Sequence, residues 1–183
     1  AGINVIPCYQ TTKYLEFTPR DMGGGFKGEI PPNSALLQQT QRVGSKEILP
    51  SGNELVKSDQ HFCLIVDEDG SIQPVVIDMK STQLKVSRRW KTQIAMQKMK
   101  NPKTGQMVTP PVFATMWKLR SVEESNDQGS WANWTLEKVG LVDDRDTFME
   151  AKSFRESVAA GEAKAAPEEV PADNSVANDE IPF

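Results

Sequence analysis

The sequence has few of the residues that most often carry out chemistry. It contains one histidine and two cysteines among 183 residues. Cys8 and Cys63 form no metal-binding spacing, so we expect two reduced, buried thiols, with one disulfide between them as the alternative. His61 opens an apolar strand, where a structural role is the default expectation. No serine or cysteine has a second residue at the spacing of a nucleophile motif, so the sequence predicts no enzyme and no cofactor or metal.

Long hydrophobic segments are also missing. No run of eighteen apolar residues occurs, so no membrane-spanning helix is expected. The sequence opens without the charged and then apolar residues of a signal segment, which predicts a cytoplasmic protein with no membrane partner.

Acidic residues are absent from one stretch, residues 79–122, which we call the basic segment. Its ten basic side chains are Lys80, Lys85, Arg88, Arg89, Lys91, Lys98, Lys100, Lys103, Lys118 and Arg120. Residues 1–78, 123–160 and 161–183 carry net charges of −4, −5 and −5, and the basic segment carries +10, so the total is −4. A basic segment inside an acidic molecule indicates a polyanion as the partner.

Aromatic and β-branched residues predict a mainly β chain. We expect strands over 5–17, 61–66, 71–79, 108–122 and 131–141, with turns at 67–70 and 125–130. Segment 35–49 is interpreted as another strand, with a short helix as the alternative, and 18–34 and 50–60 as connections. Within the first connection, RDMGGGFKG lacks the spacing of a phosphate-binding loop. We expect a plain surface loop there, with a loop that folds over nucleic acid as the alternative.

Two segments have helical periodicity. Val86, Trp90 and Ile94 share one face of a helix over 81–99, and Phe148, Ala151, Phe154 and Val158 share one face of a helix over 143–161. A helix between the third and fourth of five strands predicts an OB-fold-like barrel, with a small mixed β-sandwich as the alternative. We therefore divide the chain into an OB-like nucleic-acid-binding domain (1–141), a C-terminal helix (142–160) and a disordered acidic tail (161–183).

Tryptophans accompany the cations in SRRWK and MWKLR. Unpaired bases stack on aromatic rings while Lys and Arg follow the phosphates, so this mixture is typical of single-strand binding. The candidate phosphate contacts are Lys80, Arg88, Arg89, Lys91, Lys118 and Arg120, and the candidate stacking residues are Trp90, Trp117 and Trp131. Core packing is the competing interpretation for each tryptophan, since Trp90 shares the helical face of Val86 and Ile94. Trp131 and Trp134 should point to opposite faces of their strand.

The acidic tail ends on its most apolar residues, which a solvated segment cannot bury by itself. We interpret them as hydrophobic contacts for the pocket of another protein. The neighbouring carboxylates would pair with basic residues around that pocket. The five last residues, Asp179, Glu180, Ile181, Pro182 and Phe183, resemble the C-terminal tip of bacterial and phage single-stranded DNA-binding proteins. That resemblance implies a divergent phage-type member, at work in the bacterial host cell, whose tip docks replication, recombination or repair proteins.

These features together predict a non-enzymatic protein that coats and protects single-stranded DNA and recruits partner enzymes. The alternative is an interaction protein that mimics the host tip, and sequesters or redirects host repair enzymes without coating DNA. An annealing protein is a third interpretation. A nuclease is disfavoured because the basic segment contains no carboxylate for a metal. The sequence leaves a homo-oligomer open.

Overall fold

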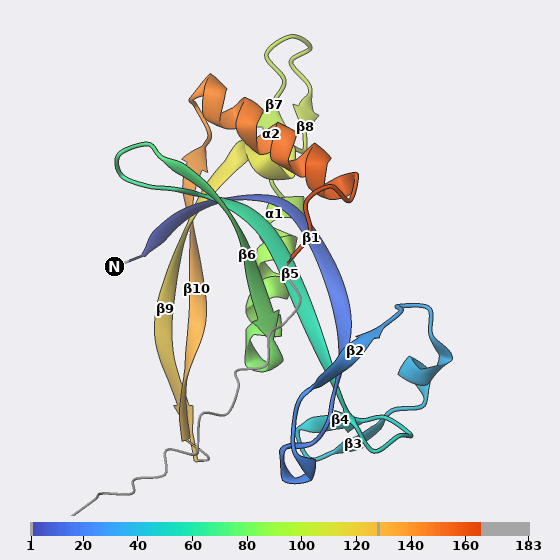
Figure 1. Ribbon diagram of the computed structural model, residues 1–183. Helices are drawn as coiled ribbons and strands as arrows, with labels where there is room; N and C mark the ends of the chain where they lie inside the picture. Colours follow the sequence, from blue (N-terminus) through green and yellow to red (C-terminus); the bar gives the residue numbers. More distant parts are fainter. Residues whose placement is uncertain (1, 128, 166–183) are drawn as a thin grey trace, which may run out of the picture.

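Two long antiparallel strands, β1 (Ile3–Phe17) and β5 (Glu54–Val66), run through the centre of the sheet in the computed structural model, which describes residues 2–127 and 129–165. Their pairing extends from Asn4 opposite Val66 to Phe17 opposite Glu54. The two strands are shared by two groups of neighbours, one at each end of the pair (Figure 1).

With the larger group, the β1–β5 pair makes up five strands of an eight-stranded sheet. β9 (Thr115–Asn126) pairs with the start of β1, β10 (Gly129–Leu141) pairs with β9, and β6 (Ile72–Lys80) pairs with β5. The order is β10-β9-β1-β5-β6. β1 meets β9 only from Ile3 to Val5, opposite Leu119 to Trp117, so the remainder of β9 pairs only with β10 as a two-stranded ribbon (Figure 1).

The smaller group surrounds the other end of the β1–β5 pair. β2 (Phe26–Ile30) pairs with β1, and β4 (Lys46–Ile48) pairs with β5 and with β3 (Gln41–Val43). Short 3-10 turns, η1 (Arg20–Met22) and η2 (Ala35–Gln38), lie in the connections. A separate two-stranded hairpin, β7 (Met99–Lys100) with β8 (Met107–Val108), follows the first helix.

The sheet is open. Among the described residues no pairing joins the edge strands β6 and β10, so the chain is mainly β as predicted but the predicted barrel is not closed. Helix α1 (Leu84–Ala95), which follows 3-10 turn η3 (Ser81–Gln83), contacts both β6 and β10. A helix inserted between two edges keeps them too far apart for backbone hydrogen bonds, which must join strands about 4.8 Å apart.

The predicted apolar face of α1 is confirmed. Trp90 is fully buried in a core with Val5, Cys63, Met79, Trp117 and Leu119, and Val86 and Ile94 pack against this core. We call it the α1 core. The Trp90 ring meets the Trp117 ring edge-to-face with centroids 6.2 Å apart. The two rings therefore join the helix to β9.

Helix α2 (Arg145–Ala159) covers the opposite face of the sheet. Its Ala151 and Phe154 pack with Ile6, Leu64 and Phe113, in what we call the α2 core. Adjacent strand residues such as Cys63 and Leu64 belong to different cores because successive side chains point to opposite faces. The C-terminal helix predicted over 143–161 is confirmed, with Asp144 as its N-cap and Gly161 in the left-handed region just after it.

A β-bulge marks where α2 meets β1. The register shifts between Pro7 and Tyr9, which leaves the backbone carbonyl of Cys8 to accept a 2.9 Å hydrogen bond from the Arg155 guanidinium. That guanidinium also lies over the Tyr9 ring, 5.8 Å from its centroid. Cys8 and Cys63 are both buried as predicted, and burial raises the pKa of the Cys8 thiol to about 12.

Several predicted element bounds differ from the structure. Residues 54–60 of the connection predicted over 50–60 form the first half of β5, because the polar Ser58 and Asp59 are buried in the sheet and hide the strand pattern. The connection over 18–34 contains β2, and segment 35–49 contains a 3-10 turn followed by the β3–β4 hairpin. β9 starts at Thr115, since Val112–Ala114 is a 3-10 turn. The predicted turn at 67–70, closed by Gly70 at φ 84°, is confirmed.

Candidate nucleic-acid interface

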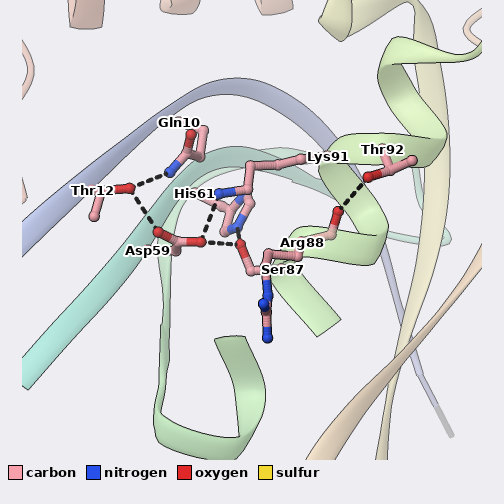
Figure 2. Close-up of polar contacts among 8 residues, drawn as sticks. All are labelled: Gln10, Thr12, Asp59, His61, Ser87, Arg88, Lys91 and Thr92. Carbon is pink, nitrogen blue, oxygen red and sulfur yellow. Dashed lines mark hydrogen bonds and ion pairs between the residues drawn. The ribbon is translucent and has the colours of Figure 1, made fainter. Parts of the chain in front are cut away.

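A buried polar network fixes α1 to the sheet (Figure 2). Asp59 of β5 is 1% exposed and accepts hydrogen bonds from Ser87 (2.6 Å), Thr12 (2.7 Å) and Lys91 (2.8 Å). These hydrogen bonds and the Lys91 ammonium hold the pKa of Asp59 at about 2, although its burial acts in the other direction. Asp59 is therefore ionised at neutral pH.

His61 completes this network. Its Nε2 lies 2.8 Å from the Ser87 hydroxyl, and its ring lies 4.7 Å from the Trp90 ring, centroid to centroid. Burial lowers the pKa of His61 to about 4, so the imidazole is neutral at pH 7. Because the Ser87 hydroxyl gives its one proton to Asp59, the Nε2–H of His61 donates to the Ser87 oxygen. A histidine that donates to a serine cannot take that serine's proton. In this arrangement Asp59, His61 and Ser87 therefore stabilise the fold.

One of the predicted phosphate contacts, Lys91, belongs to this network. The Lys91 ammonium is bound to Asp59, and its side chain is 36% exposed. Removing it from Asp59 would leave a buried carboxylate without its cation, which is costly. Lys91 therefore holds α1 on the sheet in this structure.

The solvent face of α1 carries two exposed guanidiniums, Arg88 and Arg89. Within the described part of the chain, neither has an ion-pair partner, whereas Lys85 beside them pairs with Glu124 of β9 at 3.0 Å. The predicted Arg88 and Arg89 thus lie together on one surface. They project from a helix that the Asp59 network holds in place.

The other predicted cations lie apart from this pair. Arg120 is exposed on β9 and pairs with Glu137 of β10 at 3.4 Å, and Lys118 stands opposite Glu137 in the strand register. Lys80 ends β6, where its backbone N–H donates to the Gln83 side chain. Lys98, Lys100 and Lys103 lie on or beside the β7–β8 hairpin, beyond the end of α1 at the top of Figure 1. The basic segment therefore spreads over several elements.

The predicted stacking tryptophans divide into two groups. Trp90 and Trp117 are 0% and 2% exposed in the α1 core, so neither ring presents a face to the surface. Trp131 is half-buried near the tip of the β9–β10 ribbon, opposite Glu124 in the register. Trp134 packs against the α1 core. Of the three candidates, only Trp131 has part of its side chain at the surface.

A second basic surface, which was not predicted from the sequence, lies within residues 1–78, a segment with a net charge of −4. A groove of about 770 Å³ lies between the β3–β4 hairpin and the start of α1. Four of the six basic residues of residues 1–78 line it: Arg20, Arg42, Lys46 and Lys57. Summing charge over 78 residues hid this cluster, because the acids that balance the sum lie mostly elsewhere. The cations are far apart in the sequence and meet only through strand pairing, so no local sequence pattern marks the cluster.

Residues Asp179, Glu180, Ile181, Pro182 and Phe183, predicted to bind partners, lie outside the described residues. In the part that is described, neither helix has the length and apolar character needed to cross a membrane.

Comparison with known protein families gives a match over most of the chain. A family described as Pam3 phage gp34-like protein matches residues 1–164, which include every described strand and helix. No curated protein and no solved structure matches the chain. Since the match covers most of the sequence, the chain belongs to the Pam3 phage gp34-like protein family.

Proposed function

We propose that this protein binds single-stranded DNA without catalysis, protecting it during replication, recombination or repair, as a divergent phage-type relative of the single-stranded DNA-binding proteins. The observation that carries the proposal is the solvent face of α1. Arg88 and Arg89 are exposed there without carboxylate partners among the described residues, inside a segment of charge +10. Guanidiniums that are not committed to protein carboxylates are available for phosphates.

The strand order supports the same proposal. An OB fold has a helix between its third and fourth strands, and β1, β5, β6, α1, β9 and β10 follow that order here. In this comparison the missing β6–β10 pairing corresponds to the closure of the barrel, and α1 stands at that position. We therefore interpret the sheet as an opened OB-type sheet, a form suited to single-strand binding.

The test measures DNA binding directly. A fluorescein-labelled thymine oligonucleotide is titrated with the protein, fluorescence anisotropy is followed at several salt concentrations, and a duplex of equal length is compared. We expect tight binding to the single strand, weaker binding to the duplex, and loss of affinity with salt. Absence of single-strand binding at low salt would refute the proposal.

Paired variants then test the α1 face. Arg88→Gln/Arg89→Gln should weaken single-strand binding by about tenfold and make the salt slope shallower by about 1.4, at roughly 0.7 for each phosphate contact. Arg145→Gln/Lys152→Gln removes the same charge from α2, on the other face of the sheet, and should change binding much less. Equal effects of the two pairs would mean that net charge, and not the α1 face, controls binding.

A further inference from the structure

We propose that the groove between the β3–β4 hairpin and the start of α1 holds the backbone of a single-stranded nucleic acid, with one base stacked on Tyr14. This inference rests on the proposed function and says where on the molecule the single strand would lie. The groove lies outside the basic segment apart from its α1 end, formed by Ser81, Thr82 and Leu84.

The floor of the groove is a part of the sheet that α1 leaves uncovered. On the α1 face of the β1–β5 pair, Gln10 stands opposite His61 and Thr12 stands opposite Asp59. His61 and Asp59 contact Ser87 of α1, so the helix covers both positions. The next pair on the same face is Tyr14 opposite Lys57, and both line the groove. An aromatic ring and an ammonium thus stand side by side just beyond the helix.

Cations line the groove from a 3-10 turn and two short strands. Arg20 comes from η1, Arg42 from β3 and Lys46 from β4. The acids on its lining, Glu47 and Glu54, already accept from Thr40 and Lys46. Within residues 2–127 and 129–165, no carboxylate pairs with Arg20, Arg42 or Lys57, whose charges are therefore available to an anion.

The chain turns sharply where β6 passes into α1. Ser81 has φ 50°, in the left-handed region, and is the one non-glycine residue among those described with a positive φ. This turn places Ser81 and Thr82 on the groove, with Leu84 after them. Arg88 follows Leu84 by four positions, so it lies on the same side of the helix one turn further along. The groove cations therefore lead toward the solvent face of α1.

This geometry selects the chemistry of the ligand. Several cations that line one groove match a chain of phosphates better than a single anion. A half-exposed tyrosine among them matches an unpaired base, since every base offers a flat face and stacking tolerates any sequence. A duplex keeps its bases paired and stacked, so it could use the cations but not Tyr14. The occupant we infer is a single strand.

Three variants test the groove with the full-length protein in the anisotropy assay. Tyr14→Leu should weaken single-strand binding between about fivefold and 150-fold, the range for loss of one stacked base, while Tyr14→Phe keeps the ring and should bind like the wild type. Arg42→Gln/Lys57→Gln should make the salt slope shallower by about 1.4. Circular dichroism and urea unfolding check that each variant folds.

Photo-crosslinking locates the base without any substitution. An oligonucleotide containing 5-iodouracil is irradiated with the wild-type protein, and crosslinked peptides are identified by mass spectrometry. The two tyrosines of the chain form a matched pair, because Tyr14 faces the groove while Tyr9 packs against Phe62 on the α2 face. We expect crosslinks at Tyr14 and none at Tyr9.

The outcomes separate the two proposals. If the wild type binds the oligonucleotide, but the groove variants bind equally well and Tyr14 does not crosslink, the groove is not the path and the proposed function stands. If the wild type does not bind single strands at all, the proposed function fails and the groove proposal fails with it.

Discussion

At the scale of single residues, His61 makes the stability of the fold depend on pH. Its pKa is about 4 in the folded protein, against an ordinary value near 6.5, so the unfolded chain binds more protons between these values. Stability contributed by the neutral imidazole is therefore fully present above pH 6.5 and is lost as pH falls toward 4. Asp59, with its pKa lowered to about 2, loses its contribution only at still lower pH.

We predict that the free energy of unfolding falls by about 2 kcal/mol through His61 between pH 7 and pH 4.5. Urea unfolding at several pH values measures it. His61→Gln is the control, since its amide can still donate to Ser87 but does not titrate. The variant should be less stable at pH 7 and should show a flatter pH profile. Parallel profiles for the two proteins would show that His61 is not a buried neutral imidazole.

The sequence predicted residues by pattern and could not predict their neighbours. Trp90 was expected in the core as one interpretation because Val86 and Ile94 share its helical face, and the core contains it. Lys91 looked like its exposed basic neighbours, and only the fold brings it to Asp59, 32 positions earlier in the chain. A salt bridge between distant positions leaves no periodic signal in a sequence.

At the scale of elements, α2 is fixed to the sheet by a contact that the sequence does not suggest. The predicted apolar stripe accounts for Ala151, Phe154 and Val158, but the Arg155 guanidinium also binds the Cys8 carbonyl at the β-bulge. A bulge exposes a backbone carbonyl that the regular ladder would otherwise use. A charged donor to such a group contributes about 1.5–3 kcal/mol.

We predict that Arg155→Gln lowers the free energy of unfolding by about 2 kcal/mol, through loss of this hydrogen bond and of the contact with the Tyr9 ring. The midpoint of urea unfolding reports the change. Lys152→Gln, in the same helix, removes only an exposed pair with Glu156 and should cost less than about 0.5 kcal/mol. Similar midpoints for the two variants would mean that Arg155 does not hold the helix.

Elements were predictable where one face is apolar and were missed where both faces carry polar residues. Helix α2 and the strands β6 and β10 follow their patterns closely, while α1 ends at Ala95, four residues before the end predicted for it. The first half of β5 did not, because Asp59 and Ser58 are buried through hydrogen bonds and not through apolar contact. Polar burial needs partners from other elements, which a local pattern cannot show.

At the scale of the whole molecule, the order of these elements along the chain was predictable and closure of the barrel was not. The order of β1, β5, β6, α1, β9 and β10 follows from local signals, but whether β6 reaches β10 depends on what lies between them. Trp90 is the largest fully buried side chain there, and its helix contacts both edges. The candidate site could not be predicted from local signals either, because the groove cations Arg20, Arg42 and Lys57 meet only through tertiary pairing.

The sheet and the C-terminal tip are expected to bind different partners, DNA for the sheet and proteins for the tip. Deleting residues 181–183 should leave single-strand affinity within about twofold of the full-length value, because the proposed DNA contacts lie on α1 and in the groove. The same deletion should abolish capture of host replication and repair enzymes on a column of the immobilised protein, since it removes the apolar side chains that would fill a partner's pocket. Anisotropy and quantitative mass spectrometry of the eluates measure the two effects on one preparation.

Arg88→Gln/Arg89→Gln is the reciprocal control, with weakened DNA binding and unchanged capture. A full-length protein that captures these enzymes through the tip but binds no single strand would instead support mimicry of a host tip.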